Sequence, residues 1–177
     1  MRNSRGFSLV ELLVVLAIVA ILVSVAMVLY RQVRLRGGEA SAIASLEAIN
    51  QAQFAYMQTC GNQRYAPTLA ELGKPLPGTN TAYLSPDLTV EGEEVVKSGY
   101  VLRMSGTPDL EGPKTCTGAT PVGGYVVTAD PAIPGVGGDR YFGTNTDRVI
   151  FEDVESFHPD MPETGPPEHG RELPAVR

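Results

Sequence analysis

Residues 6–30 of the chain read GFSLVELLVVLAIVAILVSVAMVLY, and this stretch decides the fold. Its last nineteen residues, Leu12 to Tyr30, carry no formal charge. At roughly 1.5 Å per helical residue, such a run matches the roughly 30 Å hydrocarbon thickness of a bilayer. A secretory signal has a shorter apolar part that ends at small residues, whereas this run ends at Tyr30 and is followed by Arg31. The stretch therefore predicts a helix that crosses a membrane.

Glu11 is the residue that a plain membrane anchor does not explain. A carboxylate in an apolar helix costs on the order of 2.5 to 3.5 kcal/mol at mid-bilayer, and less near the interface. One interpretation is that Glu11 reaches the headgroup zone on its own, and the other is that it has a partner. The flanking arginines, two before the run and three after it, are nearly balanced and do not settle the orientation of the helix.

The residues around Glu11 favour a partner. The stretch Arg5-Gly6-Phe7-Ser8-Leu9-Val10-Glu11-Leu12 resembles the class III prepilin signal of type IV pilins and type II secretion pseudopilins. The resemblance implies that prepilin peptidase cleaves between Gly6 and Phe7, that Phe7 is N-methylated, and that Glu11 is the assembly carboxylate. Cleavage would create an ammonium at Phe7, which is as unfavourable in an apolar bundle as the carboxylate. A pair between staggered subunits would therefore set their register.

The sequence and this resemblance together predict an α+β pilin fold. The expected parts are a leader (1–6), an apolar transmembrane and filament-core helix (7–36), a globular domain (37–154) and a tail (155–177). The tail has five prolines and five acidic residues and little apolar periodicity, so we expect it to be disordered or extended.

The second half of the long helix is predicted to be amphipathic. From Glu39 to Gln58 the apolar residues fall on one face, as in a helix laid on a sheet. These residues are Ile43, Leu46, Ile49, Phe54 and Met57. Pilins often have a proline kink in this helix, but here no proline precedes Pro67. Gly37-Gly38 either supplies flexibility in its place or is tolerated by the helix.

Short strands separated by turn residues are predicted for the remainder of the globular domain. Residues 73–98 are expected to form a loop that connects the helix to the sheet. The expected strands are Gly99 to Ser105, Gly124 to Asp130 and Arg148 to Glu152, with Asp139 to Gly143 as a fourth candidate. The glycines of Pro134 to Gly138 are not followed by a helix or by Lys-Ser/Thr, so they indicate a turn and not a phosphate-binding loop.

Cys60 and Cys116 are the only cysteines, and in an exported domain such a pair usually forms a disulfide. Closing a loop of about 57 residues would stabilise the fold by roughly 4 kcal/mol in the chain-entropy model. Two free buried thiols are the alternative. Metal binding is less favoured, since there is no CxxC motif and His158 and His169 are distant in sequence.

The sequence offers weak candidates for a calcium site and none for an enzymatic site. Asp139, Asp147, Glu152 and Asp153 could hold Ca²⁺, which related pseudopilins often bind in a C-terminal loop, but their spacing matches no EF-hand and scattered surface acids are favoured. No cofactor is therefore expected. Neither a Ser/His/Asp nor a Cys/His arrangement is visible, so we do not expect an enzyme. A net charge of −6 disfavours direct nucleic-acid binding.

The resemblance implies a structural subunit of a type IV pilus or pilus-like filament. Its implied partners are prepilin peptidase, other copies of the chain in a helical filament, and an inner-membrane assembly platform with other pilins. The implied location is the bacterial inner membrane, single-pass with a periplasmic C-terminal domain, and then an extracellular pilus or a periplasmic pseudopilus. Alternatives are a type II secretion pseudopilin, a membrane-anchored binding domain that never polymerises, and an envelope enzyme.

Overall fold

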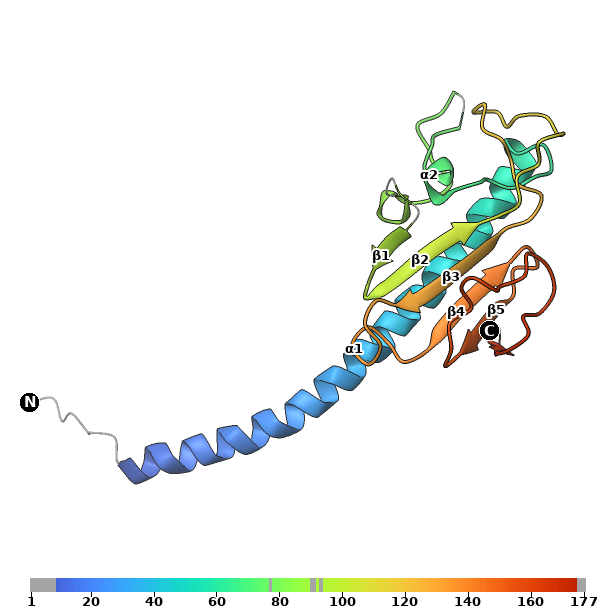
Figure 1. Ribbon diagram of the computed structural model, residues 1–177. Coiled ribbons are helices and arrows are strands. Elements are labelled where there is room, and N and C mark those ends of the chain that lie inside the picture. Colours follow the sequence, from blue (N-terminus) through green and yellow to red (C-terminus); the bar gives the residue numbers. More distant parts are fainter. Residues whose placement is uncertain (1–8, 77, 90–91, 93, 175–177) are drawn as a thin grey trace, which may run out of the picture. The chain divides into compact units, whose positions relative to one another are not determined.

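The computed structural model describes residues 9–76, 78–89, 92 and 94–174. The chain divides into two compact units, Met1–Arg34 and Leu35–Arg177. Helix α1, Leu9–Thr59, supplies all described residues of the first unit and the opening helix of the second (Figure 1). The second unit contains the sheet, so the α+β class predicted from the sequence is confirmed.

The sheet is a six-stranded antiparallel meander in which each strand pairs with the next one in sequence. Its strands are β1 (Glu94–Lys97), β2 (Tyr100–Ser105), β3 (Val126–Pro131), β4 (Tyr141–Asn145), β5 (Ile150–Asp153) and β6 (Arg171–Glu172). The short helix α2 (Leu69–Leu72) and the 3-10 turn η1 (Pro86–Leu88) precede them. All four predicted strands are present, but β1 and η1 lie in the segment 73–98, where only a loop was expected.

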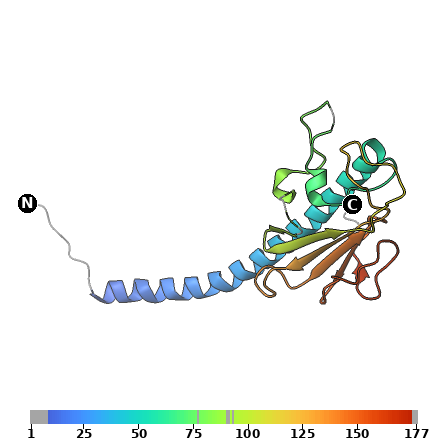
Figure 2. The same cartoon turned by 45° about the horizontal axis from the view of Figure 1, so that its top comes forward.

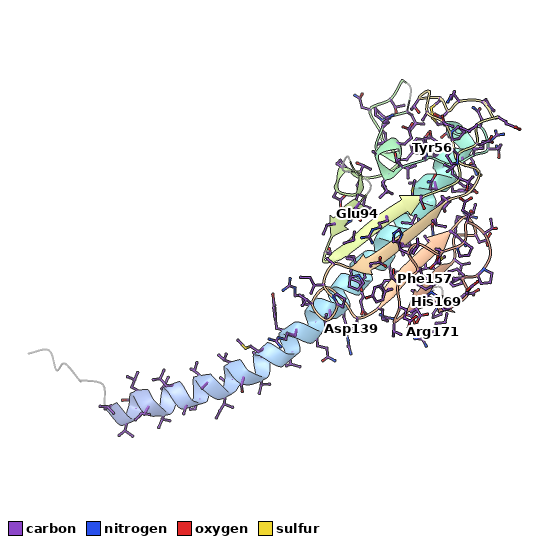
Figure 3. The ribbon with its side chains drawn as sticks, in the orientation of Figure 1. Tyr56, Glu94, Asp139, Phe157, His169 and Arg171 are labelled. Carbon is purple, nitrogen blue, oxygen red and sulfur yellow. A yellow bond between two sulfur atoms is a disulfide. The ribbon has the colours of Figure 1, made fainter. Side chains whose placement is uncertain are left out.

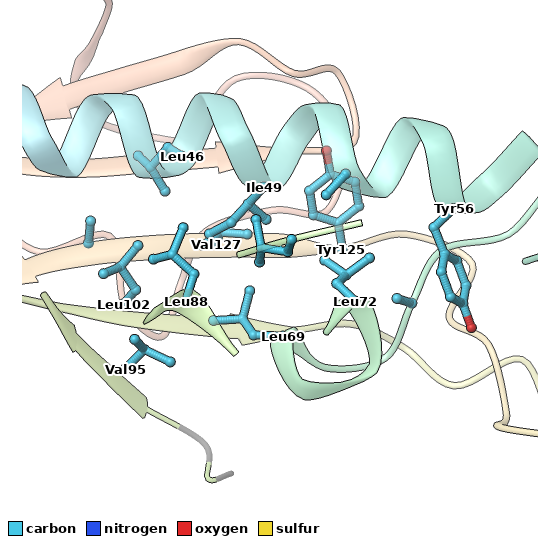
Figure 4. Close-up of a cluster of buried hydrophobic side chains, with 14 of the residues drawn as sticks. Leu46, Ile49, Tyr56, Leu69, Leu72, Leu88, Val95, Leu102, Tyr125 and Val127 are labelled. Atoms are coloured by element: carbon cyan, nitrogen blue, oxygen red, sulfur yellow. The ribbon is translucent and has the colours of Figure 1, made fainter. Parts of the chain in front are cut away.

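The second half of α1 lies on one face of this sheet (Figure 2). Leu46 and Ile49 are fully buried there, against alternate sheet residues such as Leu102 and Val127 (Figure 4). The period of two along a strand places these residues on a single face. The core thus forms between the helix and the sheet, as the amphipathic pattern predicted.

The buried face of α1 is nevertheless rotated from the predicted one. Phe54 was expected in the core but is 39% exposed, and its ring lies 4.4 Å from the Arg148 guanidinium carbon. Gln53 and Tyr56 are fully buried instead. Gln53 can be buried because its amide exchanges two hydrogen bonds with the backbone of Ala66, at 2.8 and 3.0 Å.

A second buried polar cluster ties α1 to the sheet. The Asn50 amide nitrogen donates to the Thr144 hydroxyl at 2.9 Å, and its oxygen accepts from the Tyr125 hydroxyl at 2.9 Å. Because a polar pair of this kind is satisfied in only one geometry, these contacts fix the helix relative to β4.

Helix α1 continues through Gly37 and Gly38, so the glycines do not interrupt it. Gly38 is required by packing, because a Cβ placed there would lie 2.2 Å from the carbonyl oxygen of Gly137. A Cβ at Gly37 would meet nothing within 4 Å. The two neighbouring glycines therefore have different roles.

The expectation of a disordered tail is wrong for residues 155–174. Phe157 and Met161 are buried with Val126 and Phe151, on the opposite face of the sheet from α1. Gly143 leaves the room for them, since a Cβ there would lie 3.1 Å from both Phe157 and Met161. The segment then returns to pair β6 with β5. The physical reason is that two large apolar residues suffice to bury the segment when the sheet offers a matching apolar face.

Candidate functional site: the N-terminal helix

The first unit presents an apolar helix with its side chains uncovered. Every side chain that the structure describes between Leu9 and Tyr30 is exposed. The helix is long and apolar enough to cross a membrane, judged by length and composition. Exposed apolar surface costs roughly 25 cal/mol per Å² in water, so this surface requires lipid or other apolar helices around it.

Glu11 lies in the first turn of α1 and is exposed. It is the only charged residue between Leu9 and Tyr30. Ser24, a polar residue in the middle of the uncharged run, is satisfied locally, since its hydroxyl donates to the Ile21 carbonyl at 2.7 Å. The carboxylate is therefore the group in this segment that calls for a partner outside its own helix.

Gly6 and Phe7, the predicted cleavage and methylation site, lie outside the described residues. The comparison with protein families addresses this region directly. Residues 1–27 match the family model described as the prokaryotic N-terminal methylation motif. This motif is the class III prepilin leader of type IV pilins and pseudopilins. The comparisons with curated proteins and with solved structures found no match.

The matched motif extends over the first turns of α1, and Glu11 falls inside it. The motif supports a type IV pilin-like or pseudopilin-type protein, and together with the apolar helix it fits a membrane-anchored pilin. A pilin-type leader also points to a structural protein, which is consistent with the chain not being an enzyme. The pairing of Glu11 with a neighbouring amine stays a prediction.

The globular unit contains the predicted disulfide between Cys60 and Cys116. Cys60 follows the end of α1 and is 2% exposed, whereas Cys116 belongs to the loop between β2 and β3. Their Cα atoms are 4.8 Å apart, and the backbone N–H of Cys116 donates to the Cys60 carbonyl at 2.9 Å. The bond fastens the loop after β2 to the end of the helix.

Three of the four acidic residues considered for calcium direct their carboxylates to separate contacts. Glu152 forms ion pairs with Arg140 and Arg171, and an Asp147 oxygen accepts from the Gly165 N–H at 2.7 Å. Asp153 bonds to a ring nitrogen of His169 at 2.7 Å, which holds the pKa of the Asp153 carboxyl below its ordinary value. Among the described residues, no group of three or more His, Cys, Asp or Glu side chains could hold a metal ion.

His169 takes part in packing the tail against the sheet, although its side chain stays 40% exposed. Its ring stacks on Phe157 at 5.0 Å between centroids, with an interplanar angle of 2°. Figure 3 shows the two labelled residues close together over the sheet. The stacking and the bond to Asp153 hold the tail against β5.

An ion-pair network in the globular unit was not predicted from the sequence. Glu39, 7% exposed on α1, accepts from Arg140 at 2.6 and 3.1 Å. Arg140 also pairs with Glu152, which accepts from Arg171 at 2.7 Å. Burial alone would raise the pKa of Glu39, but the Arg140 guanidinium and the Asp139 N–H outweigh it and lower the pKa. Because Glu39 and Arg140 lie about a hundred residues apart in sequence, no local sequence pattern predicts this network.

Proposed function

We propose that the chain is a structural subunit of a type IV pilus or pilus-like filament, processed by prepilin peptidase and polymerised through α1. The match of residues 1–27 to the methylation motif carries the proposal. The exposed apolar surface from Leu9 to Tyr30 supports it, because such a surface exchanges lipid for neighbouring helices at small net cost. Repetition of one non-closing contact between copies gives a fibre and not a ring.

In this proposal Glu11 pairs with the N-terminal amine of a neighbouring subunit. Cleavage after Gly6 places that amine on Phe7, four residues before the carboxylate in sequence. Within the apolar interior of a filament, an unpaired charge would cost roughly 3 to 5 kcal/mol when its partner is removed. The pair therefore permits only the stagger at which amine and carboxylate meet.

Processing is tested first, by the intact mass of the membrane-purified protein. We expect a chain that begins at Phe7 and carries one methyl group. Gly6→Leu should leave the uncut precursor in the membrane. A mature chain that retains Met1 to Gly6, or one cut after Tyr30, would contradict the proposal and would favour a membrane-anchored domain that does not polymerise.

Assembly is tested by Glu11→Leu, expressed as the sole copy of the subunit. We expect the folded domain, the disulfide and the membrane pool to be unchanged, while the filament fraction released by shearing falls sharply. Ser24→Ala is the matched control, because it removes a polar group from the apolar run without removing a charge. Filaments of normal abundance from the Glu11→Leu chain would show that apolar packing alone drives assembly.

A further inference from the structure

The loop between β3 and β4 has no polar side chain over seven residues. Residues 132–138 read Ala-Ile-Pro-Gly-Val-Gly-Gly, and we call this segment the apolar loop. Residues 132–136 are all exposed, with Ile133 at 61% and Val136 at 46%. Single exposed aliphatic residues are ordinary on protein surfaces, but five consecutive exposed residues without a polar side chain form an apolar patch that needs an explanation.

The loop after β2, at the other end of the sheet, shows the ordinary composition. Residues 106–122 include Asp109, Glu111, Lys114 and four threonines. This loop is fastened to Cys60, at the far end of α1. The two exposed loops therefore differ in chemistry, which indicates that they face different surroundings.

Close glycine packing holds the apolar loop in place. A Cβ at Gly99 would lie 2.9 Å from the Gly137 Cα, and one at Gly38 would lie 2.2 Å from the Gly137 carbonyl oxygen. The Ile133 carbonyl accepts from the N–H groups of Val136 and Gly137 at 3.1 and 3.0 Å. Ile133 and Val136 are thus displayed on a fixed turn and do not depend on ordering when a partner arrives.

The apolar loop lies at the end of the globular unit that is tethered to the membrane-length run. Asp139 donates its N–H to Glu39, and Gly137 packs on Gly38, so the chain lies against the start of the unit where it leaves the loop. Figure 3 labels Asp139, which lies beside α1 at this place. Gly38 lies eight positions after Tyr30 in sequence, a tether of roughly 12 Å when helical and at most roughly 27 Å when extended.

We propose that the apolar loop is a membrane-contact surface, with Ile133 and Val136 entering the headgroup and upper acyl region while the subunit resides in the bilayer. The partner is the phospholipid surface itself. The exposed arginines Arg31, Arg34 and Arg36 follow the apolar run in sequence, where their charges complement lipid phosphates. This inference rests on membrane residence of α1, and it does not require polymerisation.

The test uses tryptophan fluorescence, because the chain contains no tryptophan. Ile133→Trp and Leu110→Trp are each made in the full chain, since Leu110 is an 83% exposed aliphatic residue on the polar loop. Met27→Trp reports the membrane span. The proteins are reconstituted at low density in phosphatidylcholine–phosphatidylglycerol vesicles, with and without acyl chains brominated near the glycerol. Intact disulfides, checked by alkylation, confirm that each variant is folded.

We expect brominated lipid to quench most of the Ile133→Trp emission and to leave the Leu110→Trp emission unchanged. Equal emission of Ile133→Trp in both lipids would overturn the proposal. So would a blue shift that grows with protein density without quenching, because the loop would then contact a second copy of the chain.

The Met27→Trp emission separates this inference from the proposed function. If it is quenched while Ile133→Trp is not, membrane residence stands and the contact surface fails. If neither is quenched, membrane residence fails and the loop proposal fails with it. Adding Glu11→Leu to Ile133→Trp should leave the quenching unchanged, because contact with lipid does not require polymerisation.

Discussion

Gly37 and Gly38 differ in what a side chain would meet, and this predicts opposite effects on stability. Gly37→Ala should stabilise the protein by up to about 1 kcal/mol, because alanine is the better helix former and space is open there. Gly38→Ala should destabilise it by roughly 1 to 3 kcal/mol, because its Cβ would meet the Gly137 backbone. Urea unfolding of the full chain in detergent measures both. Equal midpoints for the two variants would contradict the packing described here.

The Glu39–Arg140 pair predicts a pH dependence with a definite sign. The folded-state pKa of Glu39 lies below its ordinary value of 4.5, so its contribution to stability is present above pH 4.5 and is lost as the pH falls through the folded-state value. Glu39→Gln should therefore lower the free energy of unfolding by roughly 1 to 3 kcal/mol at pH 7, and by less in acid. Unfolding curves at several pH values measure this difference. A difference that stays constant with pH would exclude the carboxylate charge as its source.

At the scale of elements, the C-terminal segment is predicted to be part of the fold. Phe157→Ala should destabilise the protein by roughly 3 to 5 kcal/mol, because the ring is 1% exposed and fills the outer face of the sheet. Glu168→Ala, an exposed position in the same segment, should change stability by less than about 0.5 kcal/mol. Thermal unfolding compares the two. Similar small effects would mean that the segment is dispensable.

The elements that were predictable from sequence are those with a strong local pattern. The uncharged run predicted the first half of α1. Short strand-forming runs bounded by Gly and Pro clusters predicted β2 to β5. The tail was missed because its contacts with the sheet are long-range and its composition is that of a disordered segment. Strand β1 was missed because its four residues lie among turn-forming neighbours. The rotation of the α1 face could not be predicted, because Gln53 is buried only through a hydrogen-bonded partner in another segment.

For the whole molecule, the disulfide predicts on which side of the membrane the globular unit folds. Cytosolic thiols are kept reduced, so a bonded Cys60–Cys116 pair requires an oxidising compartment. Alkylation of intact cells should label neither cysteine before reduction and both after it. Cys60→Ala with Cys116→Ala should lower stability by roughly 4 kcal/mol in the chain-entropy model. Full labelling without reductant would place the unit in the cytosol.

The motif around Glu11 could be predicted from the sequence, whereas the place of the apolar loop in the fold could not. The leader is a contiguous motif, so a few residues around Glu11 were enough to propose cleavage, methylation and a charge partner. The apolar loop was visible in the sequence only as a turn. Its closeness to the start of the globular unit depends on packing between Gly38 and Gly137, which are about a hundred residues apart.

The nearest-neighbour order of the sheet has a consequence for biosynthesis. A chain that folds from its N-terminus can add the strands one at a time, because each strand pairs with the strand that precedes it in sequence. The outer face of the sheet is different, because Val126 and Phe151 are covered only when Phe157 and Met161 emerge. A folding intermediate in which strands β1 to β5 have paired and Phe157 has not yet docked would expose an apolar face of the sheet. Chaperone binding should therefore be strongest for that intermediate.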